Sequence, residues 1–212
     1  MSSITLLLRG LVIGLSIAAP VGPIGVLCIR RTLADGRAVG FASGLGAATA
    51  DALFGCVAGF GLTFISGILL EQQLWLRLVG GLFLCYLGVK TLLSRPAEVA
   101  ATAQGKGLLG AYTSTLFGAY TSTLFLTATN PLTIFAFAAI YAGLGAAAGG
   151  YSAAITLVAG VFAGSALWWL LLSGGVSLFR AKFDARSLLW VNRISGVVIV
   201  GFGFFALSSL LP

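Results

Sequence analysis

The chain has 212 residues, of which 59% are hydrophobic and only 8% are charged, and its formal net charge is +7. Soluble domains carry about a quarter charged residues, so this composition excludes a soluble fold and predicts an all-α integral membrane protein. No polar stretch is long enough to form a second domain, so we expect a single transmembrane domain over residues 1–212. The basic residues are spread over separate short loops, which indicates membrane topology and not binding to nucleic acid.

The first apolar run covers about residues 4–29 and is interrupted by two prolines. Pro20 and Pro23 each lack an amide donor and clash with a preceding carbonyl, so a straight helix cannot continue through them. At membrane depth such breaks occur where the backbone lines a cavity, as in the binding sites of secondary transporters. We therefore expect the backbone around Pro20, Gly22 and Pro23 to contact a substrate or ion. The alternative is a kink that serves packing only, because proline and glycine are common in membrane helices.

The second run, residues 39–65, contains Asp51, the only acidic residue deep inside an apolar segment. An aspartate at the centre of a membrane helix costs about 2.5–3.5 kcal/mol on insertion scales, so it indicates an ion or substrate contact. Gly44, Ala48 and Gly55 share a helix face with Asp51, and small residues at this spacing favour an interior position. We expect Asp51 to accept a proton, to balance a substrate ammonium, or to do both in turn. The alternative is a carboxylate satisfied within a purely structural network.

Four further apolar runs are each long enough to span a bilayer, which takes about 20 residues; they cover residues 74–93, 108–144, 151–178 and 188–211. The run that begins at residue 108 is too long for one ordinary span and contains the sequence TATNP. Pro131 breaks the helix there, and Asn130 places a polar side chain at membrane depth. Thr127, Asn130 and Pro131 are therefore predicted to form a second substrate-contacting break.

The basic residues fall mainly on one side of the predicted spans. Ten of the twelve lie in or beside the loops after the first, third and fifth runs: Arg30, Arg31, Arg37, Lys90, Arg95, Lys106, Arg180, Lys182, Arg186 and Arg193. The positive-inside rule places these loops in the cytoplasm and both termini outside. Three runs before the Arg95 loop and three after it would have opposite orientations. The sequence thus predicts six transmembrane helices in two inverted three-helix repeats, about 1–95 and 107–212, with broken first and fourth helices.

An eight-residue sequence occurs twice in direct succession. Residues 110–117 read GAYTSTLF, and residues 118–125 repeat them identically. Eight residues add about 12 Å to a helix and turn its face by about 80° beyond two full turns. The two copies cannot present the same side chains to the same neighbours, so we expect one copy to be displaced toward the cytoplasmic end.

The remaining residues offer little for catalysis. The chain has no histidine, so Ser-His and Cys-His pairs are excluded, and we expect neither an enzyme nor a cofactor. Three cysteines form no CxxC pair and are best explained as buried hydrophobic residues. Trp168 and Trp169 are predicted to anchor the fifth span at the membrane interface, with the alternative that one of them lines the transport path. Arg30, Arg31 and Arg37 are interpreted as determinants of orientation.

Three segments together are similar to one transporter family. They are residues 14–23 (GLSIAAPVGP), Asp51 with its neighbouring glycines, and the pair Asn130-Pro131. In these segments the chain resembles the LysE/RhtB family of small bacterial inner-membrane amino-acid exporters. The resemblance implies efflux of amino acids or related metabolites, driven by a proton or ion gradient, and commonly a homodimer.

These observations lead to one main hypothesis and two alternatives. The main hypothesis is a secondary active exporter of an amino acid or related small metabolite in the bacterial cytoplasmic membrane. Its partners would be the small-molecule substrate, a coupling proton or ion and the lipid bilayer. The first alternative is a cation or heavy-metal exporter that uses Asp51 with a cysteine such as Cys56. The second is a membrane scaffold without transport activity.

Overall fold

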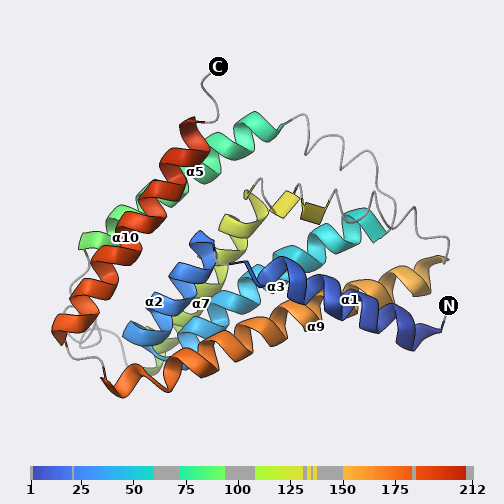
Figure 1. The fold of residues 1–212 in the computed structure, drawn as a ribbon, viewed down its shortest axis with the longest axis horizontal. Coiled ribbons are helices and arrows are strands. Elements are labelled where there is room, and N and C mark those ends of the chain that lie inside the picture. The colour runs from blue at the N-terminus through green and yellow to red at the C-terminus, as the bar shows by residue number, and fades with distance from the viewer. Residues whose placement is uncertain are drawn as a thin grey trace.

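A computed structural model describes residues 2–20, 22–59, 72–93, 108–130, 133–134, 136–137, 150–182 and 185–208. Every regular element within these ranges is helical, which confirms the predicted all-α class (Figure 1). The elements are α1 (Ser3–Ala18), α2 (Pro23–Asp35), α3 (Arg37–Gly59), α5 (Gln73–Leu93), α7 (Leu108–Ala128), α9 (Gly150–Ser177), the short 3-10 helix η1 (Arg180–Lys182) and α10 (Ala185–Ser208).

Several of these helices can cross a membrane by length and composition. In the part of the chain that the structure describes, α3, α9 and α10 each contain a sufficiently long apolar segment. The pair α1 and α2 passes the same test together as one broken span, and α5 contains a shorter apolar stretch, Leu78–Leu93. The predicted count of six spans stays a prediction.

The first predicted span is divided into two helices by its prolines. Ser2 caps the start of α1, where its side chain accepts a hydrogen bond from the Thr5 amide at 3.3 Å. After Ala18 the chain turns, and Gly22 caps α2 in an extended conformation with Pro23 as the first helical residue. Proline is favoured at that position because its missing amide would have no helical partner there. The axes of α1 and α2 differ by 83°, so α2 begins inside the molecule.

The helices run back and forth between two ends of the molecule. In Figure 1, α2, α5 and α9 end at the lower left, where α3, α7 and α10 begin. Described basic residues gather at this end: Arg30, Arg31, Arg37, Lys90, Lys182, Arg186 and Arg193. The one-sided charge seen in the sequence thus corresponds to one end of the fold.

Close backbone contact holds α1 against α9. A Cβ atom at Gly14 would lie 2.1 Å from the backbone oxygen of Val161, and one at Gly164 would lie 2.1 Å from that of Leu11. Gly10 and Gly160 face each other in the same way. Small residues allow this approach, and no larger side chain fits without moving a helix.

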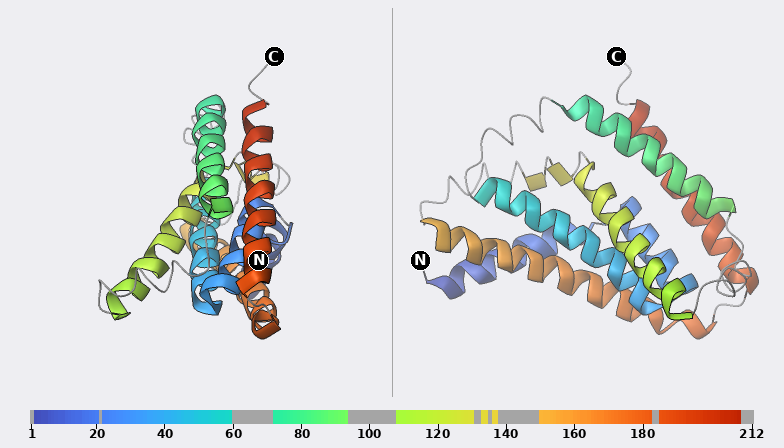
Figure 2. Two further views of the ribbon diagram at one scale, coloured as in Figure 1. Left: turned by 90° about the vertical axis from the view of Figure 1, so that its left-hand side faces the viewer. Right: turned by 180° about the vertical axis from the view of Figure 1, so that it is seen from behind.

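The helices α5 and α10 form a second close pair. Gly81 and Gly88 on α5 lie against Gly203 and Gly196 on α10, so this interface is also built from small residues. The right-hand view in Figure 2 shows the pair along one edge of the molecule, away from α1 and from the first part of α9. Contacts of α10 with α2 join the pair to the rest of the structure.

The two copies of the eight-residue repeat lie in one continuous helix, α7. Thr123 of the second copy is fully buried, whereas its counterpart Thr115 in the first copy is exposed. Tyr120, also in the second copy, donates its hydroxyl hydrogen to Thr49 of α3 over 3.0 Å. The second copy therefore makes the interhelical contacts, and the first extends α7 toward the end of the fold where basic residues gather.

Candidate functional site

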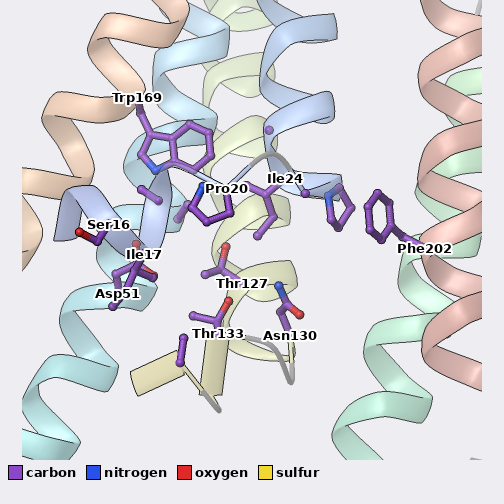
Figure 3. Close-up of a pocket in the computed structure, with 16 residues that line it drawn as sticks. Ser16, Ile17, Pro20, Ile24, Asp51, Thr127, Asn130, Thr133, Trp169 and Phe202 are labelled. Carbon is purple, nitrogen blue, oxygen red and sulfur yellow. The ribbon is translucent and has the colours of Figure 1, made fainter. Parts of the chain in front are cut away.

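A cavity of about 490 Å³ lies where the break between α1 and α2 meets α3, α7, α9 and α10 (Figure 3). Six of the seven predicted site residues line it: Asp51, Pro20, Gly22, Pro23, Thr127 and Asn130. The seventh, Pro131, lies outside the described residues. These residues are far apart in the sequence, and they were predicted because they break a helix or place a polar or charged group in an apolar segment. In the structure they border the same cavity.

Asp51 lies on α3 with only 3% of its surface exposed. Its Oδ2 atom accepts a hydrogen bond from Ser165 Oγ on α9 at 2.7 Å, and Ser165 is itself fully buried. Of the described residues that line the cavity, Asp51 is the only one with a formal charge. Burying an ionised carboxylate is costly unless a partner compensates it, and one hydroxyl compensates only part of that cost. The carboxyl is thus suited to bind a proton or a cationic group.

The second break forms one wall of the cavity. After α7, the Asn130 amide donates to the Thr127 carbonyl at 3.2 Å, and the Asn130 carbonyl accepts from the Thr133 amide at 3.1 Å. Figure 3 shows the side chains of Thr127, Asn130 and Thr133 together on the side of Pro20 opposite Trp169. This wall is polar although it lies inside a predicted membrane span.

The first break contributes the start of a helix. Ile24 and Gly25, in the first turn of α2, line the cavity beside Pro23. Amide groups in a first turn have no partner further back in the helix, and the helix dipole places partial positive charge there. Such a helix start favours an anionic group, whereas Asp51 favours a cationic one.

Trp169 lies where the alternative interpretation of the sequence placed it, and not where the main one did. It was predicted to be an interfacial anchor, but its side chain is 4% exposed and lines the cavity one helical turn beyond Ser165. Its indole Nε1 is buried and has no hydrogen-bond partner among the residues that the structure describes. An unsatisfied buried donor costs about 1–3 kcal/mol, so its presence in a cavity wall points to a ligand.

Two arginines in the C-terminal half of α2 bind neighbouring helices. Arg31 Nη1 donates to Ser43 Oγ at 2.8 Å and to Thr123 Oγ1 at 3.0 Å, and its Nη2 donates to Ser122 Oγ at 2.8 Å. Arg30 Nε donates to Asn192 Oδ1 at 2.8 Å. Their interpretation as determinants of orientation was therefore incomplete, because they also join α2 to α3, α7 and α10.

The metal-site alternative has little geometric support. Cys56 is described by the structure and is not among the residues that line the cavity with Asp51. Within the described ranges, no group of three or more cysteine, aspartate or glutamate side chains could hold a metal ion.

The comparisons with known proteins agree with the geometry of this cavity. The family of LysE type translocators matches residues 15–210. The chain belongs to the LysE family. It is also 30% identical, over 201 residues, to a protein of Bacillus subtilis (strain 168) named "Putative amino acid efflux protein YcgF", covering 92% of this chain and 91% of that relative. No solved structure matches the chain.

Membership of the LysE family fixes the general class of the protein. It is a multi-pass membrane translocator and not an enzyme. The match begins just before the first break and ends at residue 210, beyond the end of α10, so it includes every described residue that lines the cavity.

Proposed function

We propose that this protein is a secondary active exporter of an amino acid or related small metabolite, and that Asp51 is its central binding group. The observation that carries the proposal is a buried carboxyl in a cavity bordered by both helix breaks. A structural kink alone would need neither the cavity nor the charge. The name of the Bacillus subtilis relative, "Putative amino acid efflux protein YcgF", supports the same substrate class.

The two ends of an α-amino acid match two features of the cavity. Its ammonium group would bind Asp51, which Ser165 orients through the 2.7 Å hydrogen bond. Its carboxylate would bind near the first turn of α2, where Ile24 and Gly25 line the cavity. One cargo molecule would thus satisfy both the acidic group and the helix start.

Export against a gradient requires an energy source, and Asp51 is the group that could couple to it. A carboxyl that exchanges a proton for the cargo ammonium would link efflux to the inward movement of protons. In a variant of this proposal, efflux is coupled to the movement of another ion through the same carboxyl. Neither form requires a nucleotide or a cofactor.

Alternating access in this proposal relies on the two inverted repeats. If the two repeats are equivalent, α1 in the first corresponds to α7 in the second, and α3 corresponds to α9. The contact of α1 with α9 then corresponds to the contact of α7 with α3. Both contacts are present, and two further pairs, α3 with α9 and α5 with α10, map onto themselves. This symmetry supports the repeats. The proposal also places the basic end of the fold in the cytoplasm, both termini outside the bacterial cytoplasmic membrane, and two copies in a homodimer.

Purified protein in vesicles tests the function. Wild-type vesicles loaded with labelled amino acids should release at least one of them faster when a proton gradient is imposed. Asp51→Asn should abolish the gradient-dependent part, because an amide cannot exchange a proton. Asp35→Asn is the matched control, since Asp35 lies at the far end of α2 and does not line the cavity. Unchanged efflux in Asp51→Asn, with the protein folded and inserted, would refute the proposed role.

A further inference from the structure

Trp169 provides the cavity with a hydrogen-bond donor that nothing in the described chain uses. Its indole Nε1 is buried without a partner, although the side chain is 4% exposed and lines the cavity. Figure 3 shows the ring beside Pro20, with its nitrogen at the edge toward the side of the view where Asp51, Ser16 and Ile17 lie. Buried indole N–H groups usually have a partner, so a bound molecule is the natural source of one.

We infer that Trp169 is a cargo-recognition residue whose indole N–H donates a hydrogen bond to the carboxylate of an α-amino acid with an uncharged side chain. This inference rests on the proposed function and adds to it the group that recognises the acid end of the cargo. Ser165 and Trp169 lie one turn apart on α9, so this helix both orients the carboxyl that binds the ammonium and supplies a donor for the carboxylate.

The rest of the cavity determines the class of side chain. Asp51 is the only charged residue among the described lining residues, and the cargo ammonium uses it. A cationic side chain would bring a second positive charge without a carboxylate to pair with it, at a high desolvation cost. The apolar residues that line the cavity include Ile24, Ala136 and Phe202, which favour an apolar or small uncharged side chain.

Exchange measurements in vesicles test this role. Uptake of a labelled uncharged amino acid into preloaded vesicles gives its half-saturating concentration. Trp169→Phe keeps an aromatic ring but removes the N–H group, so we expect the half-saturating concentration to rise about tenfold, as for one lost hydrogen bond to a charged group. The amine that lacks only the carboxylate should show the same half-saturating concentration in wild type and Trp169→Phe.

Trp168→Phe is the matched control, because Trp168 is the neighbouring residue, is half-buried and does not line the cavity. We expect its half-saturating concentration to equal that of the wild type. An unchanged half-saturating concentration in Trp169→Phe, or an equal rise for the amino acid and its amine, would overturn the inference. If efflux still depended on Asp51, the proposed function would remain. Efficient exchange of lysine or arginine would overturn the assignment to uncharged side chains. Failure of the wild type to exchange any amino acid would overturn both proposals.

Fluorescence gives a second test that does not depend on the folding of Trp169→Phe. The chain has four tryptophans, and replacing Trp75, Trp168 and Trp190 with phenylalanine leaves Trp169 alone. Addition of an uncharged amino acid should shift or quench its emission, and addition of the corresponding amine should produce a smaller change. Equal responses to the two compounds, or none to the amino acid, would contradict the inference.

Discussion

Ser165 on α9 donates a hydrogen bond to Asp51 on α3, with 2.7 Å between Ser165 Oγ and Asp51 Oδ2. Both residues are almost completely buried, so this bond joins two long helices at the acidic group of the cavity. Among the described residues, Ser165 is the hydrogen-bond donor to that carboxyl.

Removal of this hydroxyl should affect both stability and transport. We expect Ser165→Ala to lower the free energy of unfolding by about 1–3 kcal/mol, because a buried acceptor loses its donor. Efflux should slow as well, since the carboxyl is no longer oriented. Ser173→Ala is the control: Ser173 is also buried on α9, but its hydroxyl donates to the Leu170 carbonyl within the same helix. Thermal unfolding and vesicle efflux measure the two effects, and equal losses in the two variants would contradict the expectation.

A methyl group at Gly14 should separate α1 from α9. Its carbon would lie 2.1 Å from the Val161 backbone oxygen, which cannot move without the helix. We expect Gly14→Ala to destabilise the protein and to reduce efflux strongly, because α1 positions the first break. Gly175→Ala on α9 has open space around it and should be neutral or slightly stabilising, since alanine favours a helix by about 1 kcal/mol over glycine. Comparison of unfolding temperatures and of efflux in the two variants tests this expectation.

The guanidinium of Arg31 joins three helices through four hydrogen bonds, to Ser43, Ala119, Ser122 and Thr123. A lysine has a single nitrogen and cannot reproduce this geometry. We expect Arg31→Lys to lower the free energy of unfolding by about 2 kcal/mol, the effect of losing about two such bonds. Arg186→Lys, at an exposed position of α10, should change the unfolding temperature little. A similar unfolding temperature for both variants would show that the network contributes nothing to stability.

Deletion of residues 110–117 should be tolerated. The second copy of the repeat contains Tyr120 and Thr123, which contact other helices, whereas Thr115 and Phe117 of the first copy are exposed. The deletion leaves every residue from 118 onward in its present register. We expect the shortened protein to insert and to export at a rate close to that of the wild type. Deleting residues 118–125 gives the same final sequence and cannot serve as a control. The informative control is the deletion of residues 119–122 alone. It turns the two parts of α7 on either side of the deletion by about 40° relative to each other, and it should abolish efflux.

The sequence predicted which residues border the cavity better than it predicted the details of packing. Asp51 and the two breaks could be found because charge and helix interruption are rare in apolar spans and are costly unless they serve a purpose. Trp169 could not be found by the same reasoning, because tryptophan is common at membrane interfaces and its orientation depends on how α9 is rotated. Ser165 was missed for a similar reason: a single serine in an apolar helix often bonds to its own backbone.

The arginines show a different limit. Their number and position were sufficient to indicate an orientation, but the sequence could not show that Arg31 reaches Ser43 and Thr123, since this depends on the 83° bend between α1 and α2. Contacts between distant helices follow from the fold and not from local pattern.

The tandem octapeptide has a practical consequence for handling the protein. Because α7 has already accommodated an eight-residue extension at the end remote from the cavity, the segment ahead of residue 118 is a suitable place to insert an epitope or a fluorescent reporter. Such a label would follow the fate of the protein in living cells without disturbing its cargo.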